Sequence, residues 1–239
     1  SLSDSHTASL KYIKHTQEKT EALTNRYSLM ARLRRVIGAG TLQVALQPKM
    51  ELATLTPVGF EALARWQLED GSFVSPEVFI ELAETAGLIS ELDSVVFDKI
   101  LQIIDKLGDI GVNLPIAFNA SAFDLVDPNY CKKILHKLKD ANIPPEMLEL
   151  EITETQAISN YDLIRESLDK FMALGIKVSI DDFGTGYSSI SHITEIPANT
   201  LKIDKCFLNN IDGNDNNQYI FEMIVNLAKR FDFSIIVEG

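Results

Sequence analysis

The sequence has 239 residues, 46% of them hydrophobic, and no apolar run reaches the roughly 18 residues that a membrane-spanning helix needs. Its 22 Lys and Arg residues face 34 Asp and Glu residues, and this net charge of −12 argues against a nucleic acid polymer as partner. Two cysteines without metal-like spacing and no signal-peptide pattern favour a cytoplasmic domain that makes no membrane contact of its own. A longer parent protein can still be tethered to a membrane.

The first predicted element is a helix over 10–37, which Gly38 and Gly40 would end. Its first half is too polar to bury. The helix is therefore either the first packed helix of the domain or a connector from an upstream domain. We predict a linker or signalling helix over 1–38 and a second region over 39–239.

Strands and helices alternate along that second region. Strands are predicted over 42–48, 58–66, 114–121, 147–154, 176–183, 200–204 and 233–239. Helices are predicted over 75–110 (with a break at Gly87), 128–142, 160–175, 187–196 and 216–232. Alternation predicts parallel strands with right-handed crossovers. The number of units and the length favour an α/β fold of the TIM-like (β/α)8 barrel type over an open doubly wound sheet, whose glycine fingerprint is missing.

Nearly every predicted strand carries a polar side chain at or near its C-terminal end. These residues are Glu61, Arg65, Asn119, Glu151, Glu154, Asp181, Asp182, Lys202, Asp204 and Glu238. In a parallel barrel such ends converge on one face. Neighbouring acids in a regular strand point to opposite faces, but at a strand end Asp181 and Asp182 can both reach that mouth. Crowded carboxylates repel, and an all-oxygen set suits Mg²⁺ or Mn²⁺, so the pattern favours two-metal hydrolysis of a phosphate ester.

Six stretches resemble the successive motifs of EAL domains, the bacterial cyclic di-GMP phosphodiesterases. They are "EALARW" (61–66), "FNAS" (118–121), "ELEITET" (149–155), "DDFGTGYSS" (181–189), "LKID" (201–204) and "VEG" (237–239). The resemblance covers roughly residues 30 to 239 and follows the order of the family's motifs. It implies a barrel whose first strand is antiparallel to the others. The family's pattern continues past the residue that Gly239 matches, so we expect this chain to lack the C-terminal strand.

The resemblance also implies a role for each matched residue. The implied metal ligands are Glu61, Asn119, Glu151, Asp181, Asp182 and Glu238, with Asp181 as the bridge between two ions. Glu61, Lys202 and Glu238 would be catalytic, with Lys202 holding the water or phosphate. Gln47 and Arg65 resemble residues that hold a guanine base and a phosphate. The residues implied to couple metal binding to dimer formation are Glu154, Phe183, Gly184, Thr185, Gly186, Tyr187 and Ser188.

The implied reaction is hydrolysis of cyclic di-GMP to linear pGpG with two Mg²⁺ or Mn²⁺ ions. The alternatives are a catalytically inactive cyclic di-GMP receptor and an interaction domain that binds no nucleotide; the intact acids favour the enzyme. The implied partners are a second copy in a homodimer and an upstream sensor or GGDEF-type domain in a longer parent protein. Lys49 stands where the family usually has an aliphatic residue, and we interpret it as a charge on the rim.

Overall fold

The structure is a computed structural model that describes residues 23–185, 195–209, 211 and 215–239. These residues form two compact units. The smaller unit contains residues 23–42 and 65–92, and the larger unit contains residues 43–64 and the described residues from 93 onward. A search of the described helices finds none with the length and apolar character needed to cross a bilayer.

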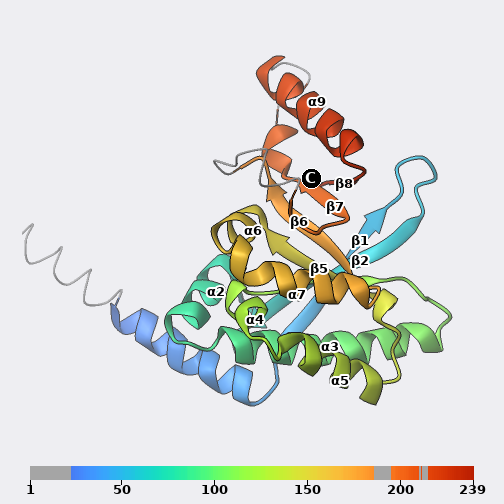
Figure 1. The fold of residues 1–239 in the computed structure, drawn as a ribbon. Coiled ribbons are helices and arrows are strands. Elements are labelled where there is room, and N and C mark those ends of the chain that lie inside the picture. Colours follow the sequence, from blue (N-terminus) through green and yellow to red (C-terminus); the bar gives the residue numbers. More distant parts are fainter. Residues whose placement is uncertain (1–22, 186–194, 210, 212–214) are drawn as a thin grey trace, which may run out of the picture. The chain divides into compact units, whose positions relative to one another are not determined.

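A sheet with the strand order β1-β2-β4-β5-β6-β7-β8 forms the framework of the larger unit (Figure 1). Its strands are β1 (Gln43–Met50), β2 (Pro57–Gln67), β4 (Ile116–Asn119), β5 (Leu148–Thr153), β6 (Lys177–Phe183), β7 (Thr200–Ile203) and β8 (Ser234–Val237). From β2 to β8 all these neighbours pair in parallel. A hydrogen bond from the Glu51 N–H to the Thr56 carbonyl closes the turn between β1 and β2. The predicted parallel α/β fold with an antiparallel first strand is therefore confirmed.

The alternation of side chains gives this sheet one apolar and one polar face. In β5, Leu148, Leu150 and Ile152 are fully buried, and Glu149 and Glu151 alternate with them. The apolar face shares one core with the helices that follow the strands. These helices are α3 (Ile89–Asp109), α4 (Ala122–Val126), α5 (Tyr130–Asp140), α6 (Glu154–Ser159), α7 (Tyr161–Ala173) and α9 (Asp215–Arg230). The opposite, polar face carries the candidate site.

Two local differences from the sequence prediction concern short helices. Helix α4 lies where no helix was expected, with the Ser121 side chain accepting a hydrogen bond from the Asp124 N–H. Glu154 begins α6 and does not end a strand, because Thr153 and Gln156 form a capping box that stops β5. Two 3-10 turns are also present, at Pro145–Met147 and Lys205–Phe207. Most of the helix predicted over 187–196 lies outside the described residues.

The smaller unit contains the helix over residues 23–38, the end of β2, the short strand β3 (Phe73–Val74) and α2 (Pro76–Thr85). Trp66 and Phe79 are buried there and their rings meet edge to face, with centroids 6.3 Å apart. The break predicted at Gly87 is confirmed: this residue has a φ of +66° and ends α2 before α3 begins. Gly40, with a φ of +62°, follows the end of the first helix in the same conformation.

Candidate metal centre

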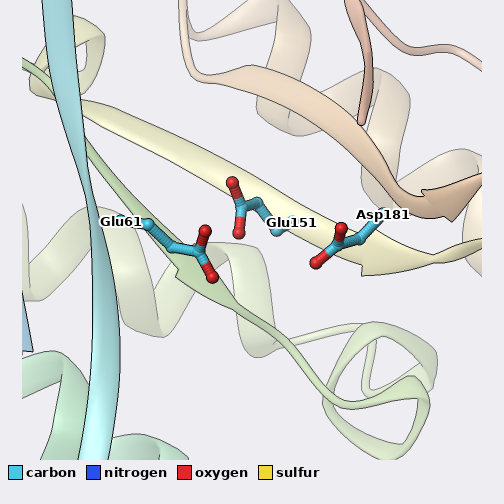
Figure 2. Close-up of side chains that lie close together, drawn as sticks. All are labelled: Glu61, Glu151 and Asp181. Carbon is cyan, nitrogen blue, oxygen red and sulfur yellow. The ribbon is translucent and has the colours of Figure 1, made fainter. Parts of the chain in front are cut away.

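Three carboxylates from three strands converge on the polar face of the larger unit. Figure 2 shows Glu61 from β2, Glu151 from β5 and Asp181 from β6 pointing toward one another. One oxygen from each of them lies within 4.8 Å of the others. Glu151 is completely buried, and the side chains of Glu61 and Asp181 are each 14% exposed. The strand ends therefore bring these acids together as predicted.

A second group shares Asp181 with the first and adds Asp182 and Glu238, again with oxygens within 4.8 Å of one another. Asp182 has a φ of +54°, and its N–H donates to Asp181 Oδ1 at 2.8 Å. The pairing of β6 with β7 is irregular between Ile180 and Phe183. The left-handed conformation of Asp182 interrupts the alternation of side chains, so Asp181 and Asp182 reach the same site although they are neighbours.

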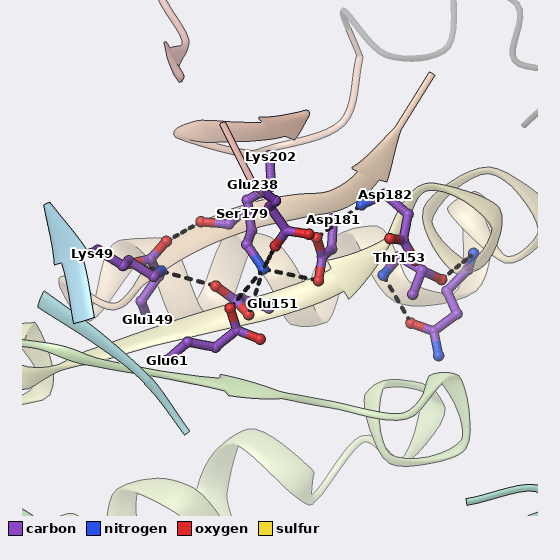
Figure 3. A network of polar contacts seen from close by, with 11 residues as sticks. Lys49, Glu61, Glu149, Glu151, Thr153, Ser179, Asp181, Asp182, Lys202 and Glu238 are labelled. Atoms are coloured by element: carbon purple, nitrogen blue, oxygen red, sulfur yellow. Dashed lines mark hydrogen bonds and ion pairs between the residues drawn. The ribbon is translucent and has the colours of Figure 1, made fainter. Parts of the chain in front are cut away.

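Lys202 contacts carboxylates of both groups, as Figure 3 shows. Its Nζ is 3.1 Å from Glu61 Oε2, 3.2 Å from Glu151 Oε2, 3.0 Å from Asp181 Oδ2 and 2.9 Å from Glu238 Oε1. The side chain is 1% exposed. Burial acts to lower the pKa of Lys202, but the attraction of the surrounding carboxylates outweighs it and raises the pKa well above its usual value. The ammonium group is therefore charged throughout the neutral range.

Lys49 is the residue whose place the sequence did not predict. Its Nζ is 2.8 Å from Glu151 Oε1 and 3.0 Å from Glu149 Oε2, and its side chain is only 10% exposed. Ser179 donates to the other oxygen of Glu149. The interpretation of Lys49 as a rim charge is therefore wrong. Burial raises the pKa of Glu151 to about 7, although both lysines act to lower it.

The other predicted residues lie in different positions relative to this cluster. Asn119 is exposed and pairs with Glu151 across β4 and β5. Gln47 is exposed on β1, two residues before Lys49. Arg65 belongs to the part of β2 in the smaller unit, so its predicted contact with substrate stays a prediction.

The loop predicted to couple metal binding to dimer formation is described only at its beginning. Glu154 Oε2 accepts a hydrogen bond from the Gly184 N–H at 2.8 Å, so this glutamate holds the start of the loop. Gly186, Tyr187 and Ser188 lie outside the described residues. The predicted role of the loop in dimer formation is therefore still a prediction.

The donor set fits hard divalent cations. Both groups consist of carboxylates, and the cluster as a whole contains more carboxylates than ammonium groups. Oxygen ligands of this kind are typical of Mg²⁺ and Mn²⁺ sites, whereas zinc favours nitrogen and sulfur ligands. The uncompensated negative charge would favour binding of a cation.

The chain belongs to the EAL domain family, whose profile matches residues 30–239. It is 32% identical over 207 residues to the signaling protein YkoW of Bacillus subtilis. This match covers 87% of this chain and 26% of YkoW. The chain is also 32% identical over 228 residues to the cyclic di-GMP phosphodiesterase PdeR of Escherichia coli, covering 94% of this chain and 34% of that one. The chain thus spans about a third or less of these curated relatives.

Among solved structures, the fold is similar to that of the PaMucR phosphodiesterase in complex with c-di-GMP. The TM-score is 0.82 at 32% identity, and the match covers 89% of this chain and 86% of that one. The likeness therefore covers most of both chains.

Proposed function

We propose that this chain is a metal-dependent phosphodiesterase that hydrolyses cyclic di-GMP to linear pGpG. The observation that carries the proposal is the pair of carboxylate groups that share Asp181 and that both contact Lys202. Membership of the EAL domain family, and the activity named for PdeR and PaMucR, support the choice of substrate.

In this proposal the acids of the cluster hold two Mg²⁺ or Mn²⁺ ions. Asp181 belongs to both carboxylate groups and would help to hold both ions, and Asn119, which pairs with Glu151 across β4 and β5, would add an amide oxygen. When bound, such cations would supply Lewis acidity to a phosphate oxygen and to water near neutral pH. The remaining ligands are Glu61, Glu151, Asp182 and Glu238.

In this proposal one residue of the cluster accepts a proton from water, and another stabilises the negative charge that develops on the phosphate. Glu238 is 28% exposed, more than Glu61, Glu151 or Asp181, so it is the best placed of these four to accept a proton from a water molecule. Lys202 donates hydrogen bonds to a phosphate oxygen as negative charge develops on it. Gln47 and Arg65 contact a guanine base and a phosphate of the substrate.

We further propose the wider setting that the family resemblance implied. Residues 1–38 connect the catalytic region to an upstream sensor or GGDEF-type domain in a cytoplasmic part of a longer protein. The loop after Asp182 joins two copies into a homodimer. With a net charge of −12 the chain repels an anionic nucleotide at long range, so the bound cations provide the local attraction.

The direct test is formation of pGpG from cyclic di-GMP by the purified chain with Mg²⁺ or Mn²⁺. Glu61→Gln keeps the shape of the side chain and removes its charge, and we expect it to lower kcat about a hundredfold or more. Glu166→Gln is the matched control, because Glu166 is 82% exposed and pairs with Lys170 on the surface of α7. Absence of product from the wild type, with the nucleotide still bound, would instead indicate a receptor.

A further inference from the structure

Lys202 contacts the same carboxylates that the proposed metal ions would need. Its Nζ lies between 2.9 and 3.2 Å from oxygens of Glu61, Glu151, Asp181 and Glu238. We propose that the Lys202 ammonium is an internal counter-ion of the metal centre, which a divalent cation must displace from these carboxylates when it binds. This inference rests on the proposed metal-dependent function and concerns how the site is loaded.

Competition between the two cations follows from the geometry. The oxygens around Nζ come from both carboxylate groups: Glu61 and Glu151 belong to one, Glu238 to the other and Asp181 to both. A cation in either group therefore draws on carboxylates that are already paired with the ammonium. At a separation of a few ångströms, beside the buried side chains of Lys202 and Glu151, the repulsion between two cations is large. The divalent ion and the Lys202 ammonium group cannot contact the same carboxylates at the same time, so the ammonium group must move.

Lys49 has a different position, although its side chain is only 10% exposed and also contacts Glu151. It bonds to Oε1 of Glu151, whereas Lys202 bonds to Oε2. Its second partner, Glu149, belongs to neither candidate ligand group. A divalent cation can therefore bind without displacing Lys49, which holds Glu151 from the side of Glu149.

Displacement of Lys202 would also prepare the site for substrate. The ammonium that leaves the carboxylates keeps its three N–H donors and could donate them to a phosphate oxygen of the substrate. The change is an exchange of ion pairs, with no covalent step. Metal loading and binding of the anionic substrate should therefore be cooperative.

The experiment is a titration of metal-free protein with Mn²⁺, followed by electron paramagnetic resonance of the free ion. We expect Lys202→Met to bind Mn²⁺ about tenfold more tightly than the wild type or better, because the competing charge is gone. Lys49→Met is the matched control, since it removes one buried ammonium that contacts the same glutamate, and we expect a smaller change. Equal tightening by both variants, or none in Lys202→Met, would overturn the proposal.

A second measurement uses the wild-type chain and covers the case in which Lys202→Met does not fold. With ¹⁵N-labelled lysine, the ammonium resonances of Lys202 and Lys49 can be followed during a Mg²⁺ titration, and the Lys49→Met spectrum distinguishes them. We expect the Lys202 signal to change in proportion to bound metal and the Lys49 signal to change little. An unchanged Lys202 signal at saturation rejects the proposal.

Metal binding and displacement of Lys202 can be tested separately. A wild-type chain that binds no divalent cation would overturn the proposed metal-dependent function and this inference with it. A wild-type chain that binds the cation, without tighter binding in Lys202→Met and without a change in the Lys202 resonance, would overturn this inference alone.

Discussion

At the scale of single residues, a second acidic pair connects helices α3 and α4. Asp93 of α3 interacts with Asp124 of α4, which is 6% exposed and whose N–H donates to Ser121 Oγ at 3.2 Å. Burial, together with hydrogen bonding to Asp124, raises the pKa of Asp93 to about 8. The Asp93 carboxyl group therefore keeps its proton at neutral pH.

Because Asp93 keeps its proton in the native chain, we predict that the chain loses stability as the pH rises. The native chain keeps a proton that the unfolded chain releases above its ordinary Asp pKa. The contribution to stability is therefore complete below about pH 4 and is lost as the pH rises to about 8, by up to about 1.4 kcal/mol per pH unit. We expect Asp93→Asn to remove this loss. Urea unfolding between pH 5 and 8 measures it.

The control for this measurement is Asp105→Asn, an exposed change on the same helix. It should retain the pH dependence of the wild type. If the free energy of unfolding changed with pH equally in Asp93→Asn and in the wild type, Asp93 would not keep its proton in the native chain.

At the scale of elements, the end of β6 is fixed on two sides. Gly184, directly after the strand, has a φ of +93° and its N–H is held by Glu154 of α6. A Cβ at this position would lie 2.8 Å from Phe207 Cζ and 3.1 Å from Ile224 Cδ1. Gly184 therefore lets the chain after Asp182 pass close to the turn at Lys205–Phe207 and to α9.

Substitution of this glycine tests the close approach. Gly184→Ala combines a left-handed backbone with a steric clash, whereas Gly175→Ala, at a φ of +91°, meets nothing within 4 Å. Both should destabilise the chain, and we expect Gly184→Ala to cost about 1 kcal/mol or more beyond Gly175→Ala, measured by denaturant unfolding. Equal losses would mean that Phe207 moves aside freely.

At the scale of the whole molecule, the sequence predicted the order of elements and the meeting of distant acids. Both follow from alternation along the chain and from the convergence of parallel strand ends, which are rules of local pattern. The sequence also contains the signal for the start of α6, because Thr153 and Gln156 have the spacing of a capping box. The prediction missed this signal and extended the strand through Glu154. The contacts of Lys49 were not predictable, because it lies on the antiparallel first strand, to which the convergence of parallel strand ends does not apply.

The boundary predicted at residue 38 can be tested by deletion. Leu33 and Ile37 are 0% and 5% exposed, whereas Leu23 and Tyr27 are 56% and 69% exposed. We expect deletion of residues 1–29 to leave thermal unfolding nearly unchanged. Deletion of residues 1–38 should lower the free energy of unfolding by several kcal/mol, on the order of 2–5 for each large buried side chain lost. Equal stability of the two shortened chains would support a region that begins at residue 39.

The left-handed conformation of Asp182 also limits how this position can change during evolution. Glycine, asparagine and aspartate adopt such a conformation with least strain, and of these only aspartate carries a charge. An asparagine here would keep the backbone path and remove one carboxylate of the proposed metal centre. If the proposed function holds, one substitution could therefore remove the hydrolytic activity and leave the fold intact, which would turn a phosphodiesterase into a receptor for the same nucleotide.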